Sequence, residues 1–143
     1  SSSFGKNLSN RFEEAYGDAG NLRGRYPLAA VGFGFVQRGT IIREEPAAFA
    51  RTVDMMRKLR DRGDGNGYTA TALILVDWDD EEPAGTVRLV EQQVPSDLGV
   101  SQFMTVLIET ILEATPIDEH VRVRELYENR SLPLEESASS LES

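Results

Sequence analysis

The chain has 143 residues, of which 40% are hydrophobic and 27% charged, as expected for one soluble globular domain with a single core. It contains no cysteine, which excludes disulfides and thiolate metal sites and is compatible with a reducing cytoplasm. No stretch approaches the roughly 18–20 consecutive apolar residues of a membrane span, and residues 1–4 lack the order of a signal peptide. We therefore predict a soluble, cytoplasmic protein that does not enter a membrane.

The net charge of −9 argues against a nucleic-acid partner, but the charge is unevenly distributed. Residues 1–64 carry 11 Lys and Arg against 8 Asp and Glu, whereas residues 65–143 carry 4 against 16. Two interpretations remain open: a basic face on an acidic body, or ordinary surface helices followed by a solvated acidic tail.

A helix is predicted over residues 8–23, with Asn7 or Ser9 as its cap. Its apolar residues recur at spacings of three and four and form one stripe: Leu8, Phe12, Ala15, Tyr16, Ala19 and Leu22. The next segment, "LAAVGFGFV" (residues 28–36), is short and apolar and lies between turn residues, which indicates a strand buried on both faces. Gly32 and Gly34 share one face of it, where a bulky group could approach the backbone.

A second helix is predicted over residues 44–63, with Pro46 in its first turn and a stripe of Phe49, Val53, Met56 and Leu59. The clearest strand is "TATALILVDWDD" (residues 69–80), in which residues 73–76 should be core. Residues 86–94, "TVRLVEQQV", alternate imperfectly and are predicted to form a partly exposed or edge strand.

A third helix is predicted over residues 98–115, with these residues facing inward: Val100, Phe103, Met104, Leu107, Ile111 and Ala114. Residues 118–126 fit either a short helix or a strand. Ser, Glu and Pro dominate from residue 128, so we predict one domain over residues 1–127 and a disordered tail over residues 128–143. The order α-β-α-β-β-α predicts a layered α/β domain with a mixed central sheet flanked by helices.

The sequence contains no complete catalytic signature. It has neither a phosphate-binding loop nor a dinucleotide fingerprint nor a Gly-x-Ser-x-Gly elbow. His120 is the only histidine, and a lone histidine without cysteine is typical of a surface or structural residue.

Carboxylates provide a better candidate site. Asp77 and Asp79 end the buried strand on the same side, and Glu91 and Gln93 repeat that spacing on the next predicted strand. Such an oxygen-rich set suits Mg²⁺, which could orient a water for phosphodiester hydrolysis. The alternative interpretation is a solvated acidic turn.

The N-terminal helix offers a second set of polar residues. Lys6, Asn10 and Glu14 follow one another at spacings of four, with Arg11 beside them. A lysine, an amide, an arginine and a carboxylate could orient a phosphate or a metal-bound water. The alternative is an ordinary solvated helix face with a local Arg11–Glu14 pair.

Two stretches, "KNLSNRFEEAYGDAGNLRGRYPLAAVGFGFV" and the later "ATALILVDWDD", together resemble the second half of the restriction-endonuclease-like, PD-(D/E)XK, fold. In that family a hairpin carries Asp and then Glu-x-Lys, and a helix, a strand, a helix and a further strand follow it. The resemblance covers roughly residues 5–80 and places Asn10, Arg11, Glu13 and Glu14 on the helix after the catalytic strand. The Asp and Glu-x-Lys hairpin itself is not seen before Lys6.

The resemblance implies a DNA-binding domain capable of Mg²⁺-dependent phosphodiester cleavage. Its DNA-facing helix would act through Lys6, Asn10, Arg11, Arg23 and Arg25, with Glu14 as a catalytic candidate. In an alternative frame Asp77 and Glu91-x-Gln93 form a variant of the motif. That frame adds Asp77, Glu91 and Gln93 as catalytic candidates and Asp77, Asp79 and Glu91 as metal ligands. The alternative is a non-catalytic interaction module, which forms a homodimer or binds a partner chain through the apolar helix at residues 99–114.

Overall fold

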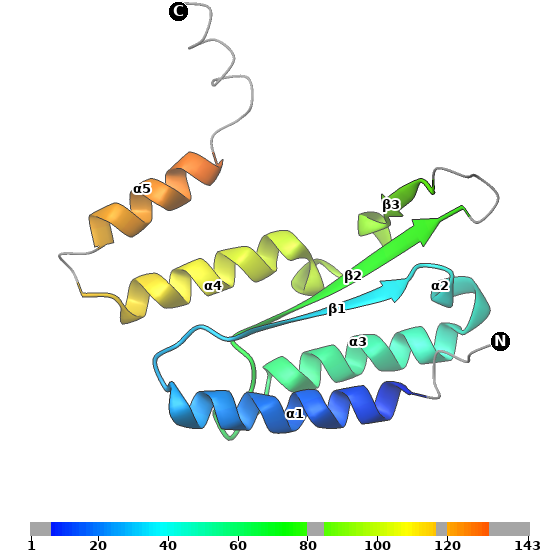
Figure 1. Cartoon of the computed structure of the whole chain (residues 1–143), viewed down its shortest axis with the longest axis horizontal. Helices are drawn as coiled ribbons and strands as arrows, with labels where there is room; N and C mark the ends of the chain where they lie inside the picture. Colours follow the sequence, from blue (N-terminus) through cyan, green and yellow to red (C-terminus); the bar gives the residue numbers. More distant parts are fainter. Residues whose placement is uncertain (1–6, 80–84, 117–119, 132–143) are drawn as a thin grey trace, which may run out of the picture.

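The computed structural model describes residues 7–79, 85–116 and 120–131 (Figure 1). Its elements are, in chain order, α1 (Leu8–Arg25), β1 (Gly32–Arg38), α2 (Ile41–Glu44), α3 (Pro46–Arg60), β2 (Ala70–Trp78), β3 (Val87–Leu89), the 3-10 helices η1 (Glu91–Gln93) and η2 (Ser96–Leu98), α4 (Val100–Ala114) and α5 (His120–Ser131). The predicted α/β class and element order are confirmed, with α2 and α5 in addition. The described part of the segment that fitted either a helix or a strand, residues 120–126, is helical, whereas residues 118 and 119 lie outside the described residues. α5 includes residues 128–131 of the predicted tail, whose remainder also lies outside the described residues.

The three strands form one mixed sheet in the order β1-β2-β3. β1 and β2 are parallel, with Phe35 opposite Leu73, and β3 runs antiparallel to β2, with Asp77 opposite Arg88. Parallel neighbours need a crossover connection, and the chain makes it through α2 and α3, which follow β1 and precede β2 in sequence. Figure 1 shows α3 on the same side of the two strands as α1.

The main core lies between the sheet and the helices α1 and α3. Phe12 of α1 packs on Phe35 of β1 with 5.4 Å between the ring centroids, and Thr71 of β2 donates a hydrogen bond to the Met56 carbonyl of α3. The inner face of the sheet is the one that carries Phe35, Thr71 and Leu73. Four residues of the predicted α1 stripe are buried, Leu8, Phe12, Ala15 and Ala19, but Tyr16 and Leu22 are exposed.

The opposite, outer face of the sheet is only partly covered. α4 crosses it at the start of β1, where a Cβ on Gly32 would lie 2.6 Å from Phe103 Cζ. This contact confirms the predicted close approach at Gly32. Gly34 is open on the same face, since nothing lies within 4 Å of a Cβ placed there, and Val36 is 59% exposed.

The prediction that residues 28–36 form a strand buried on both faces is therefore wrong. Leu28 is exposed, and the strand begins only at Gly32. The physical reason is topological: β1 has a single strand neighbour among the described residues, and α4 reaches only its first residues. An apolar run looks the same in a central strand and in an edge strand whose outer face lacks a covering layer.

The strand predicted over residues 86–94 is shorter than expected. Only Val87–Leu89 pairs with β2, and all three residues are exposed, as predicted for an edge strand. The Val90 amide still donates to the Leu75 carbonyl, after which residues 91–93 turn into η1. Glu91 and Gln93 therefore do not lie on a strand, and the predicted strand geometry for this pair is wrong.

Asp97 of η2 connects the segment before α4 to α3. Arg57 donates two hydrogen bonds to its carboxylate, at 2.9 and 2.8 Å, and Arg60 Nη1 donates a third at 3.2 Å. The hydrogen bonds from Arg57, followed by those from Arg60, lower the pKa of Asp97 from 3.8 to about 2.

Asp97→Asn is expected to lower the free energy of unfolding at pH 7 by about 1 kcal/mol, because Asp97 is partly exposed and solvent screens the pair. A lowered pKa in the folded state means that the contribution is complete above pH about 4 and is lost as the pH falls toward about 2. Urea unfolding between these pH values should therefore show a flatter acid dependence in Asp97→Asn than in the wild type. Parallel acid profiles would contradict the assignment.

Candidate functional site

Polar side chains gather where β1 and β2 end. Gln37 and Arg38 close β1, and Asp77 and Trp78 close β2. Because the strands are parallel, their carboxyl ends meet at one edge of the sheet, the place where α/β folds commonly bind ligands. In Figure 1 the N-terminal ends of α1 and α3 lie at the same end of the molecule.

A cavity of ≈ 370 Å³ at this end brings together three of the predicted site residues. Asp77 lines it from β2, and Glu91 and Gln93 line it from η1. Arg88 of β3, which lies opposite Asp77 in the strand pairing, lines it as well. The cavity thus combines two carboxylates, an amide and a guanidinium, a mixture that can hold a polar or charged small group.

The predicted magnesium ligands are only partly brought together. Asp79 is exposed and does not line the cavity shared by Asp77 and Glu91, and Glu14 is exposed on α1. Among residues 7–79, 85–116 and 120–131, no three Asp, Glu or His side chains are grouped so that they could hold a metal ion. Asp77 and Glu91 would therefore need oxygen ligands from elsewhere, such as the Gln93 amide or a bound phosphate.

Gln37 and Thr40 add polar atoms at the end of β1 that the sequence did not predict. Gln37 Oε1, Thr40 Oγ1 and Asp77 Oδ1 are buried and accept no hydrogen bond from the described residues. Gly39 lies against the Asp77 carboxylate, since a Cβ there would be 3.0 Å from Oδ1. Buried polar atoms are normally hydrogen-bonded, so a small donor such as a water molecule would satisfy these oxygens. The only sequence signal is a Gln directly after an apolar run and a Thr three residues later.

The predicted DNA-facing residues divide into two groups. Asn10, Arg11 and Arg25 are exposed on α1. Arg23 instead holds the loop before β1: its guanidinium donates to the Ala29 carbonyl at 3.3 Å and to Thr69 Oγ1 at 3.4 Å. Lys6 lies outside the described residues. The exposed face of α1 also carries Glu13, Glu14 and Asp18, so it is of mixed charge rather than basic.

α4 differs from the inner helices because none of its residues is fully buried. The predicted inward-facing residues Val100 and Ile111 are 47% and 44% exposed, and Ala114 is exposed too, so this part of the prediction is wrong. Phe103 and Leu107 are half-buried against Gly32. The physical reason is that α4 is apolar around more of its circumference than the sheet can cover.

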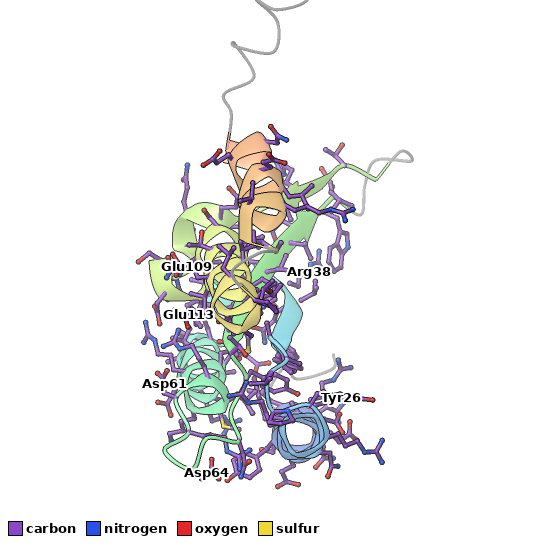
Figure 2. The ribbon with its side chains drawn as sticks, turned by 90° about the vertical axis from the view of Figure 1, so that its left-hand side faces the viewer. Tyr26, Arg38, Asp61, Asp64, Glu109 and Glu113 are labelled. Carbon is purple, nitrogen blue, oxygen red and sulfur yellow. The ribbon has the colours of Figure 1, made fainter. Side chains whose placement is uncertain are left out.

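Most of the remaining apolar side chains of α4, Val106 excepted, form a second stripe, which we call the α4 surface. Its members follow one another at helical spacings: Val100, Met104, Ile108, Ile111 and Leu112. Val100 and Ile111 are exposed, and the other three are half-buried. Figure 2 shows Glu109 and Glu113 on the side of α4 away from Arg38, so the acidic residues of the helix flank its apolar stripes. A groove of ≈ 360 Å³ beside the N-terminal end of α4 is lined by Leu73, Ile74, Leu89, Val94 and Val100 among others.

No protein-family model, curated protein or solved structure matches the chain. The resemblance to restriction-endonuclease-like nucleases therefore stays a prediction made from the sequence. Among the described residues, none of the helices has both the length and the apolar character needed to cross a membrane. His120 is the first residue of α5, and its side chain lies outside the described part of the structure.

Proposed function

We propose that this domain is a protein-interaction module that binds a partner chain through the α4 surface. The observation that carries the proposal is that α4, with its run of apolar residues, has no fully buried residue. Monomeric soluble proteins rarely expose large contiguous apolar patches, and where such a patch exists it commonly marks an interaction site. The groove beside Val100 adds a concave, apolar site into which an anchoring side chain of a partner could insert.

The flanking charges support an interface at this place. Glu109 and Glu113 are exposed beside the apolar stripe, which gives the arrangement of an apolar centre with a polar rim. A partner with basic residues around an apolar centre would complement this rim, and the overall charge of −9 would attract it.

Site-specific photo-crosslinking tests the proposal. A benzoylphenylalanine at position 111, on the α4 surface, is compared in cells with one at the exposed Arg51 of α3. A defined product is expected at position 111 only, and it should disappear when Val100→Glu is added to the same chain. Equal products at both positions, or no product at position 111, would contradict the proposal.

A second candidate function rests on the cavity that Asp77, Glu91 and Gln93 share. We propose for it the Mg²⁺-dependent phosphodiester cleavage that the resemblance implies, with DNA contacted by Asn10, Arg11 and Arg25 and also by Lys6. The support is that the two carboxylates and the amide line one cavity at the carboxyl end of β2. In this reaction Mg²⁺ would polarise a phosphate oxygen and lower the pKa of a bound water.

Two measurements test the second candidate. Filter binding is made with duplex DNA at about 50 mM salt, where phosphate contacts are strongest, and cleavage is assayed with Mg²⁺ or Mn²⁺. Asp77→Asn is expected to abolish cleavage, whereas Asp54→Asn, which changes an exposed carboxylate paired with Lys58, should leave it unchanged. Absence of any DNA affinity at that salt concentration would exclude this function.

A further inference from the structure

β1 has an open edge. The sheet order places β2 on one side of β1 and, among the described residues, no strand on the other. Residues 28–37, "LAAVGFGFVQ", contain no charged residue and no proline. Natural sheets usually protect such edges with lysines, prolines, bulges or a covering element, because an unpaired strand edge pairs readily with another strand.

The hydrogen bonding to β2 identifies the residues that face this open edge. The Gly39 amide donates to the Val76 carbonyl of β2 at 2.9 Å. Successive residues of a strand direct their backbone groups to opposite sides, so odd-numbered residues of β1 face β2. The backbone N–H and C=O groups of Gly32, Gly34, Val36 and Arg38 consequently face away from β2.

We propose that this edge pairs with β1 of a second copy of the chain, antiparallel and about a twofold axis at Phe35. In this register Gly34 lies opposite Val36 of the second copy, and Gly32 lies opposite its Arg38. All four residues have backbone groups that face the edge, so the pairs can form hydrogen bonds in the antiparallel pattern. The result is one continuous six-stranded sheet.

Side-chain volumes favour a second copy over an arbitrary strand. Val36 is 59% exposed, while nothing lies within 4 Å of a Cβ at Gly34. The twofold register places each exposed Val36 beside the open space at Gly34 of the other copy, so one strand supplies both the bulky group and the space for it. This self-complementarity is what an isologous interface requires.

The charges fit the same register. Arg38 is the only charged residue of β1, and the twofold places it opposite Gly32 at the far end of the other strand. The two arginines are therefore separated by the length of the strand pair, and no like charges face each other. The chain's excess of acidic residues lies beyond residue 64, outside this edge.

Sedimentation equilibrium from about 1 µM to about 1 mM protein tests the proposal, because it covers the affinities expected of a small interface. The wild type is expected to form a dimer. Val36→Lys places a charge on the edge and should weaken dimerisation at least about tenfold. Val87→Lys makes the same change at an exposed valine of β3 and should leave the dimer intact.

Gly34→Pro gives a second, backbone-level test. It removes an amide that faces the open edge and keeps the amides that face β2, so the monomer should retain its circular dichroism while the dimer is lost. Ile111→Lys changes the α4 surface and should not affect the dimer, which separates this proposal from the proposed function. A wild type that stays monomeric throughout, or a dimer that Val87→Lys or Ile111→Lys weakens as much as Val36→Lys does, would overturn the proposal.

Discussion

Gly67→Ala is expected to lower the free energy of unfolding by about 2–3 kcal/mol, because it forces a side chain into a closed backbone turn. A Cβ at this position would lie 2.6 Å from the Arg60 carbonyl oxygen and 2.9 Å from that of Leu59. The Leu59 oxygen cannot move freely. The Leu59 carbonyl accepts a hydrogen bond from the Tyr68 amide at 2.9 Å, and the Leu59 side chain is buried in the core.

The matched control is Gly63→Ala in the same loop. Nothing lies within 4 Å of a Cβ at Gly63, and its backbone does not adopt a positive φ. This change should alter the free energy of unfolding by less than about 0.5 kcal/mol. Urea unfolding followed by circular dichroism measures both variants, and equal effects at the two glycines would contradict the steric explanation.

The large expected effect at Gly67 follows from what its loop holds in place. The loop connects α3 to β2, and Tyr68 directly after Gly67 donates a hydrogen bond to the Ala15 carbonyl of α1 at 2.8 Å. Arg62 in the same loop stacks on Tyr16, 3.5 Å from the ring centroid. A displaced loop would therefore loosen α1 and α3 together.

The inner layer of the fold could be predicted from the sequence because its burial is periodic. α1, α3 and β2 pack against one continuous core. Their apolar residues therefore recur with the period of a helix or form a continuous apolar strand, and both patterns can be recognised in the sequence. Four of the six α1 stripe residues are buried, and so are Val53, Met56 and Leu59 of α3.

The exposure of the outer layer could not be predicted, because the sequence of a segment does not show how many strands or helices pack against it. β1 and α4 are both apolar, and their exposure depends on β1 lying at the sheet edge and on α4 covering only its first residues. An apolar segment that is buried in the core and an apolar segment that is exposed at an interaction surface have similar hydrophobicity, so hydrophobicity alone does not distinguish them.

The candidate site could be predicted only where a carboxylate residue directly follows an apolar strand. Asp77 follows an apolar strand, and the structure places it in one cavity with Glu91 and Gln93, although these two residues lie on η1. The resemblance predicts Arg23 as a DNA contact, but in the structure its guanidinium donates to loop carbonyls that are 6 and 42 residues away in sequence. Such tertiary partners leave no local pattern.

Phe12→Ala and Phe103→Ala remove the same ring from the two faces of the sheet and are expected to differ strongly. Phe12 is 2% exposed and packs on Phe35, so its loss should lower the free energy of unfolding by about 3–5 kcal/mol. Phe103 is only half-buried beside Gly32, and its loss should cost about 1–2 kcal/mol because less apolar surface returns to water.

Urea unfolding of both variants measures this difference, and hydrogen exchange of α4 amides locates it. Phe103→Ala is expected to speed exchange in α4 while α1 and α3 stay protected, because the inner core does not depend on the outer layer. Equal losses of stability would show instead that α4 belongs to the same cooperative core.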